Sequence, residues 1–323
     1  MPLTVCVFNA IIWQILALNY NVLSSSESDF ATSWGSVYSV VFTTTLAFLL
    51  VFRLNRVALR WWETRRMWGA IVAHIRVLTG EICEHLNHSP KLRDRAVAWT
   101  AAFLVASKQI LRGEKYISGD ELAGILTPVE VSLLQAAKHP PLYASGEVRH
   151  AIQRALHIDH STPDGIATSW SSIARSLETS INELIHNIGG MERVRVTPLP
   201  IVYVSHLRTF LLVYLLSLPY LYGHLWGYFT VPAVFVTSFA LLGIDGASAE
   251  CECPFQKNRV NHLDMEAYCL TAMNSILQIL IHAADMERRD DEKGDAGVET
   301  IIEEDTERHC VLEVPSHHDD SLQ

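Results

Sequence analysis

Charged residues are almost absent from the segment between Leu199 and Leu242, where Arg208 is the only permanently charged side chain. A helix in the core of a soluble domain has no need of so long an apolar run, whereas about 20 apolar residues are enough to cross a bilayer. We therefore predict two membrane spans here, roughly Leu199 to Tyr222 and Leu225 to Ile244, joined by a short turn around Gly223.

Signatures of enzymes and of disulfide-rich extracellular modules are missing as well. The six cysteines have no framework spacing, and we interpret Cys251 and Cys253 as reduced and incidental. The chain has no glycine-rich phosphate-binding loop, no nucleophile elbow and no HExxH helix. Its histidine clusters supply only fragments of a metal site, which needs three or four converging ligands. These clusters are His157 with Asp159 and His160, His85 with His88, and His317 with His318, Asp319 and Asp320. We expect no enzyme, no metal and no cofactor.

Two further apolar runs lie near the N-terminus, at Leu3 to Leu23 and Val37 to Phe52, separated by the polar loop Ser24 to Asp29. The second run is short and needs Trp34 to Asn55 to cross a bilayer without thinning it. The first could instead be a signal peptide. It lacks a charged leading region and a small-residue cleavage site, so we interpret it as a span.

A basic, tryptophan-rich segment, Arg53 to Gly69, follows the second apolar run directly. It contains five arginines against one acid, Glu63, and three tryptophans. Lys and Arg flank the cytoplasmic ends of membrane spans, and Trp favours the headgroup layer. With four spans, the basic flanks lie on one side of the membrane and the acidic loop around Glu27 and Asp29 on the other, which places both termini inside. The alternative is a soluble helix with a solvated basic face.

The middle of the chain, from Ala70 to Val196, is too polar for a membrane domain and has a helical pattern. Apolar residues recur at spacings of three and four in two places. They are Ala96, Trp99, Phe103 and Ile110 in one, and Ile173, Leu177, Ile181, Leu184 and Ile188 in the other. Proline-containing turns separate the helical stretches. We predict a helical bundle on the inner side of the membrane.

The net formal charge of −10 lies entirely in the residues from Asp285 onward. So acidic a segment with little apolar content is typical of a disordered, solvated tail. Its short apolar patches leave open a docking role. The sequence thus predicts an all-α, multi-pass membrane protein with four regions: 1–69 with two spans and the basic helix, 70–196 with the bundle, 197–284 with two more spans and a following helix, and the tail 285–323.

Three blocks of sequence resemble the bestrophin family of anion channels. The first, FRLNRVALRWWETRRMWG from Phe52, is similar to the family's hallmark after its pore-lining helix. The second is Thr197 to Tyr203, and the third is Cys253-Pro254-Phe255 followed by Asn261 to Asp264. They occur in the family's order over about Leu3 to Ala284. The residues that carry the family motif are Trp61, Trp62, Glu63, Pro200, Pro254 and Phe255.

The resemblance implies a homopentamer in which five second spans line a central pore. Thr44, Phe48 and Phe52 would form its hydrophobic neck, and residues four apart do share a helix face. The alternative is that both phenylalanines pack on neighbouring helices or lipid. Leu199 would form an inner constriction, or be ordinary core at the start of a span. The basic residues of the inner vestibule would be Arg53, Arg56 and Arg60. Some of these are expected to pair with Glu63 or with acids of the bundle, since unpaired buried charge is costly.

The function that the resemblance implies is passive conduction of monovalent anions, chloride first and bicarbonate second. The alternative is a non-conducting helical membrane scaffold whose acidic tail binds partners. Calcium activation is doubtful, because the segment Gln256 to Asn261 has bases and amides where animal bestrophins have carboxylates. The expected partners are other copies of the chain, membrane lipids and permeant anions, and not nucleic acid. The membrane itself, plasma membrane or thylakoid, stays open.

Overall fold

A computed structural model describes residues 2–20, 28–114, 119–158, 164–257 and 262–311. Helices are the only regular elements among these residues, apart from an isolated bridge between Ala123 and Leu126. The all-α prediction is therefore confirmed. The elements are α1 (Pro2–Tyr20), α2 (Ser28–His85), α3 (Pro90–Arg112), η1 (Gly119–Leu122), α4 (Pro128–Ala136), α5 (Pro140–Ile158), α6 (Asp164–Val196), α7 (Ile201–Trp226), η2 (Gly227–Phe229), α8 (Thr230–Cys251) and α9 (Met265–Val311).

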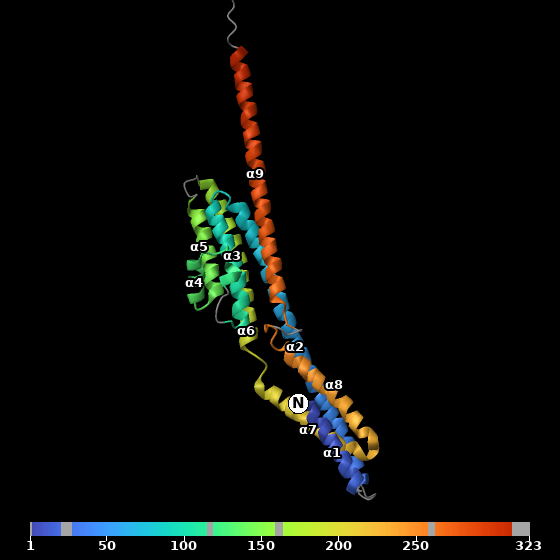
Figure 1. The fold of residues 1–323 in the computed structure, drawn as a ribbon. Coiled ribbons are helices and arrows are strands. Elements are labelled where there is room, and N and C mark those ends of the chain that lie inside the picture. The colour runs from blue at the N-terminus through green and yellow to red at the C-terminus, as the bar shows by residue number, and fades with distance from the viewer. Residues whose placement is uncertain (1, 21–27, 115–118, 159–163, 258–261, 312–323) are drawn as a thin grey trace, which may run out of the picture.

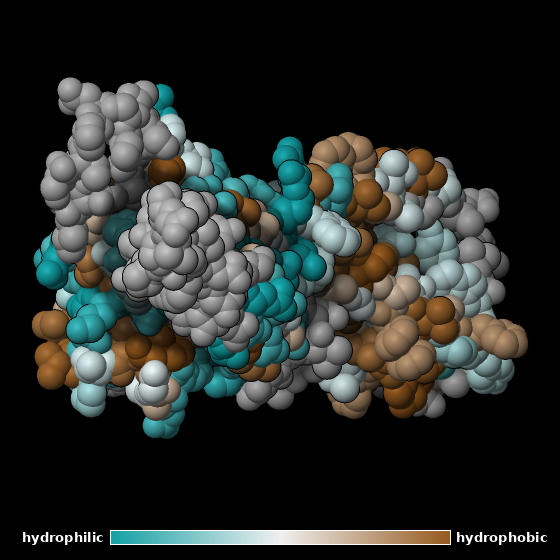
Figure 2. All heavy atoms as spheres, turned by 90° about the horizontal axis from the view of Figure 1, so that it is seen from above, coloured by the Kyte–Doolittle hydropathy of each residue, from teal (hydrophilic) through white to brown (hydrophobic). Residues whose placement is uncertain are grey.

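The molecule is elongated, with an apolar half and a bundle half (Figure 1). The apolar half contains α1, α7, α8 and the first part of α2, and the bundle half contains α3 to α6 beside the rest of α2 and α9. Seen from above, hydrophobic surface predominates on the side of the apolar half, whereas hydrophilic and hydrophobic surface are mixed on the side of the bundle half (Figure 2). The helix α2 is 58 residues long and belongs to both halves. It has no proline to interrupt it.

Within the described ranges, four helices are long and apolar enough to cross a membrane: Gly35–His85, Ile201–Gly223, Gly227–Cys251 and Met265–Arg289. The first three coincide with predicted spans. The predicted first span appears as the shorter apolar helix Pro2–Ala17, which packs on α7 and α8. Met265–Arg289 was expected as the helix after the spans, and it packs against α2 and α3 of the bundle half.

The predicted turn around Gly223 is wrong, because α7 continues as a helix to Trp226. The chain reverses at Gly227, four residues after Gly223, where the backbone φ of 49° favours glycine. Gly223 serves packing instead. A Cβ atom there would lie 2.4 Å from Nε1 of Trp13, so only glycine lets α1 approach α7 this closely.

Each half of the molecule has its own hydrophobic cluster. The cluster of the apolar half joins α1, α2, α7 and α8 through Cys6, Ala10, Leu46, Leu50, Leu207, Leu211, Tyr214, Leu215, Leu218 and Val234. The larger cluster fills the bundle and includes the fully buried rings of Trp68, Trp99 and Phe103. The predicted stripe of α6 is buried there from Leu177 to Ile188. Spacing alone thus identified the core face of this helix.

Two predicted boundaries can be compared with the helices. The one at 196/197 coincides with the end of α6 at Val196. The one at 285 falls inside α9, which continues as a helix to Val311 where the sequence predicts a disordered tail. The predicted loop at 24–29 and the histidine clusters at 157–160 and 317–320 lie largely or wholly outside the described residues.

Candidate functional site

One face of α2 in the apolar half is exposed although it is apolar. Phe48 is 62% exposed and Phe52 is 45% exposed, and their ring centroids are 4.4 Å apart. Thr44, one turn earlier, is exposed as well. The opposite face is buried, since Leu46 and Leu50 are each only 1% exposed. The three predicted neck residues therefore share a surface that no other part of the described chain covers.

This exposed face continues into the bundle half. Leu59, Trp62 and Arg66 border an open groove of about 730 Å³ on α2. Arg66 lies five helical turns after Phe48 and hence on the same face. The rings of Trp61 and Trp62 meet edge to face with centroids 5.2 Å apart, and Trp62 is exposed.

Arg53 departs from its predicted place in a vestibule, because its side chain is completely buried. It forms an ion pair with Asp245 of α8, and Asp245 also accepts a hydrogen bond from Nε of Arg208 at 3.2 Å. The sequence predicted that some of the three arginines pair with Glu63 or with acids of the bundle, and the partner of Arg53 is instead Asp245 in the apolar half. Glu63 is exposed and lies 3.7 Å from Arg193. Burial explains the pairing, since a guanidinium without solvent needs a carboxylate beside it.

The other two predicted basic residues differ from each other. Arg56 is exposed. Arg60 donates from Nη2 to the carbonyl oxygen of Val194 at 2.7 Å and from Nη1 to that of Thr197 at 2.8 Å. These carbonyls lie at the end of α6, where helical hydrogen bonds run out, so Arg60 caps this helix.

Leu199 lies half-buried in the short linker between α6 and α7. Its backbone N–H donates to Oε1 of Glu252 at 3.2 Å. Glu252 follows α8 directly, and its Oε2 lies 3.9 Å from Nη2 of Arg53. One carboxylate therefore contacts both the predicted inner constriction and the arginine next to Phe52.

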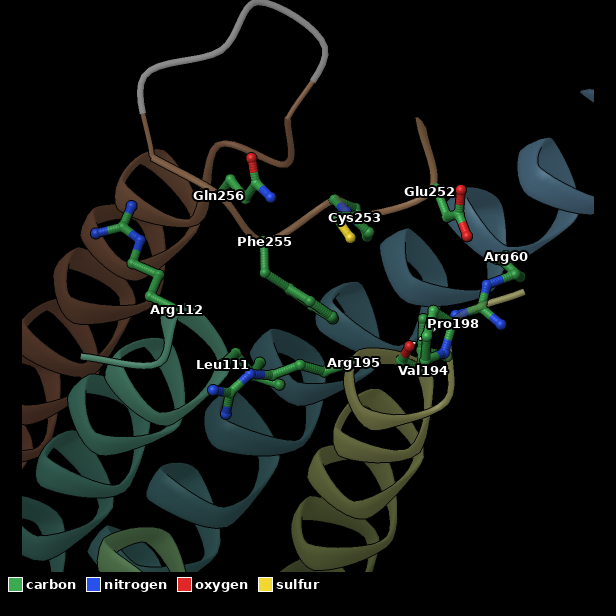
Figure 3. Close-up of a pocket in the computed structure, with 11 residues that line it drawn as sticks. Arg60, Leu111, Arg112, Val194, Arg195, Pro198, Glu252, Cys253, Phe255 and Gln256 are labelled. Carbon is green, nitrogen blue, oxygen red and sulfur yellow. Dashed lines mark hydrogen bonds between the residues drawn. The ribbon is translucent and has the colours of Figure 1, made fainter. Parts of the chain in front are cut away.

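Two of the remaining motif residues, Pro254 and Phe255, line a cavity of about 210 Å³ at the junction of α2, α3, α6 and the segment after α8 (Figure 3). Phe255 extends into it and is only 5% exposed. Pro254 is buried and accepts a hydrogen bond from the N–H of Leu263 at 3.0 Å, which closes the loop between α8 and α9. Pro200 precedes the first residue of α7. These residues shape the backbone around the linker.

A second charge cluster fixes α9 to the bundle. Nζ of Lys108 lies 2.6 Å from Glu121 and 2.9 Å from Glu266, and Arg112 lies 2.7 Å from the same Glu266. Burial disfavours the charged amine of Lys108, but the hydrogen bonds to the two carboxylates outweigh it and raise its pKa. These groups are all engaged with one another, which indicates a structural role.

Metal-binding residues do not assemble in the part of the chain that the structure describes, where no three His, Cys, Asp or Glu side chains converge. In the segment expected to lack a calcium clasp, Gln256 and Lys257 are exposed, and residues 258–261 are outside the described ranges. Asp264 accepts the N–H of Ala267 at 3.1 Å and so caps the start of α9.

Asp245 and Glu252 are the residues that sequence reasoning missed. The predicted fourth span ended at Ile244, one residue before Asp245. A signal was present in the sequence. Arg53 lies at the end of one apolar run and Arg208 lies within another, and three acids, Asp245, Glu250 and Glu252, follow the fourth run closely. Basic residues in apolar segments usually have an acidic partner. Which acid meets which base follows only from the helix packing.

The chain is similar to known proteins in sequence and in fold. The family model described as Bacterial/Fungal Bestrophin protein matches residues 3–278. A voltage-dependent anion channel-forming protein of Nostoc sp. is 33% identical over 243 residues, which are 74% of this chain and 75% of that protein. The chloroplastic voltage-dependent chloride channel 1 of Arabidopsis thaliana is 27% identical over 65% of this chain and 49% of its own length. A bacterial bestrophin homolog from Klebsiella pneumoniae has the same fold, with a TM-score of 0.73 and 23% identity over 86% of this chain and 97% of that one.

Proposed function

Because the chain belongs to the family of bacterial and fungal bestrophins, we propose that it is the subunit of a pentameric channel that passively conducts monovalent anions. It is an integral membrane protein, and chloride is the first permeant ion we propose, with bicarbonate second. The relatives named as anion and chloride channels support this assignment.

The observation that carries the proposal is the exposure of Phe48 and Phe52 on one face of α2. Five copies of α2 around one axis would turn these rings toward each other, with Thr44 one turn away. A narrow ring of apolar side chains gates by dewetting and needs no fixed charge. We therefore assign the neck of the pore to these three residues.

Leu199 forms the second, inner constriction in this proposal. It lies two residues before Ile201, the first residue of α7, where unpaired backbone N–H groups carry partial positive charge. Such a site attracts an anion weakly enough to release it, as conduction requires. Arg56, exposed on α2, adds positive potential nearby.

A closed ring is essential, because this chain alone cannot enclose a pore. The exposed face of α2 continues from the neck into the bundle half past Leu59 and Trp62. Five such faces would line one continuous path.

The test is the reversal potential of the purified protein in a planar bilayer under a chloride gradient, repeated with bicarbonate on one side. A reversal near the chloride equilibrium potential is expected, and the bicarbonate shift ranks the two anions. Phe48→Ala and Phe52→Ala should each change open probability or current, because they widen the neck and ease its wetting. Phe239→Ala is the matched control, since Phe239 is a similarly exposed ring, 64% accessible, on α8.

Two outcomes would contradict the proposal. A well-folded ring without any current would favour the non-conducting scaffold. Equal effects of Phe239→Ala and Phe48→Ala would show that the neck is not formed by the exposed face of α2.

A further inference from the structure

The linker between α6 and α7 has very few backbone groups by which it can be held. In the stretch Pro198-Leu199-Pro200 only Leu199 has an N–H, because proline has none. This one donor is taken by Oε1 of Glu252 at 3.2 Å. The carboxylate of Glu252 is therefore the acceptor for the single amide that can fix the orientation of Leu199.

The linker is held from the α2 side as well. Arg60 donates to the carbonyl oxygens of Val194 and Thr197, one before and one at the start of the linker. Figure 3 shows Arg60 and Glu252 near Pro198 and Val194, on the side of the cavity away from Arg112. The linker thus lies between a guanidinium of α2 and a carboxylate that follows α8.

Glu252 also reaches the neck helix. Its Oε2 lies 3.9 Å from Nη2 of Arg53, and its side chain is 16% exposed. Arg53 is the residue after Phe52, and its own side chain is completely buried. Arg53 also forms an ion pair with Asp245 of α8. A displacement of the Arg53 side chain therefore requires α2 to move relative to α8.

We infer that Glu252 is a positioning residue that sets the orientation of Leu199 and links it, through Arg53, to the turn of α2 that contains Phe52. The two constrictions of the pathway are then coupled through one carboxylate. A rotation of α2 that moves Phe52 also moves Arg53, and with it the carboxylate that holds Leu199. This inference rests on the proposed function, in which Phe52 and Leu199 line the path.

The test compares Glu252→Ala and Glu252→Gln with the wild type in single-channel recordings. Glu252→Ala removes the acceptor of the Leu199 amide and should change open probability about tenfold, the size expected for a hydrogen bond to a charged group. Glu252→Gln keeps an amide oxygen for the same N–H and should recover most of this change.

Repeating the Glu252→Ala substitution in a Leu199→Ala variant distinguishes a positioning role of Glu252 from a general contribution to stability. With Leu199→Ala there is no large side chain to orient, so adding Glu252→Ala should change open probability less than about twofold. A purely structural ion pair would act equally in both backgrounds. Glu178→Ala is the matched control, because Glu178 pairs with Arg149 at 2.8 Å on the surface of the bundle and should leave open probability unchanged.

Hydrogen exchange provides a readout that requires no current. The Leu199 amide should exchange faster in Glu252→Ala than in the wild type or in Glu252→Gln. Unchanged exchange of this amide overturns the inference, as does a wild-type open probability in Glu252→Ala. A wild type that forms rings but never conducts contradicts the proposed function alone, and the exchange result still decides whether Glu252 holds the linker.

Discussion

Asp245→Asn should destabilise the apolar half more than its small change in shape suggests. Asp245 is 13% exposed and contacts two arginines, one of them Arg53, which is completely buried. The substitution keeps the volume but removes the negative charge. Arg53 then retains only Glu252, 3.9 Å away. A buried guanidinium would thus lose its main counter-charge.

The size of the effect follows from this arrangement. Removing one partner of a buried ion pair costs about 3–5 kcal/mol, and we expect about 3 kcal/mol here because Glu252 and the new amide oxygen compensate in part. For Arg53→Met the expected loss is smaller, about 1 kcal/mol, because methionine fills the buried space and Asp245 keeps Arg208 at 3.2 Å. The double variant should resemble Arg53→Met, since no buried charge is left unpaired.

Thermal unfolding of the detergent-purified protein measures this difference. At roughly 2–4 °C per kcal/mol, Asp245→Asn should lower Tm by about 6–12 °C, and Arg53→Met should lower it by a few degrees. A Tm within about 1 °C of the wild type for Asp245→Asn would refute the buried pair. Strict additivity in the double variant would refute the coupling between the two residues.

Three further substitutions test the packing. Gly223→Ala places a Cβ within 2.4 Å of Trp13 and should cost about 1–3 kcal/mol, seen as a lower Tm. Trp99→Ala empties the bundle core at a ring that is 1% exposed and should cost about 3–5 kcal/mol in the same assay. Thr127→Ala removes the cap that pairs with Glu130 at the start of α4 and should cost about 1 kcal/mol near neutral pH. Burial opposes ionisation of Glu130, but hydrogen bonds from the backbone and side chain of Thr127, together with the guanidinium of Arg95, outweigh it and hold its pKa below the usual 4.5. That stabilisation is present above pH 4.5 and fades as the pH falls through the lowered pKa, so the variant should lose less stability there than the wild type.

The sequence predicted the helices better than the points where they end. Long uncharged runs and spacings of three and four residues identified α7, α8 and the core face of α6, because both signals reflect burial directly. The turn was placed at Gly223 and not at Gly227, since a glycine needed for close packing and a glycine needed for positive φ look alike in sequence. Only tertiary contacts distinguish them.

The site was predictable in part for a related reason. Spacing places Phe48 and Phe52 on one helix face. It does not say that this face is the one left exposed, which depends on Leu46 and Leu50 meeting α7. Asp245 was missed because hydropathy shows where a span ends, but it does not show that Arg53 and Arg208 of neighbouring helices lie next to that end.

The arginines of α2 show why a count of positive charges is a poor guide to the potential along this path. Arg53 forms an ion pair with Asp245, and Arg60 donates hydrogen bonds to the carbonyls that end α6. Neither offers a free guanidinium to a passing anion. Arg56 and Arg66 are exposed, and Arg66 shares the face of Phe48. The basic segment that makes the sequence look strongly attractive to anions is therefore used in large part to hold helices together, and in the proposed channel Arg56 and Arg66 would supply the positive potential near the path.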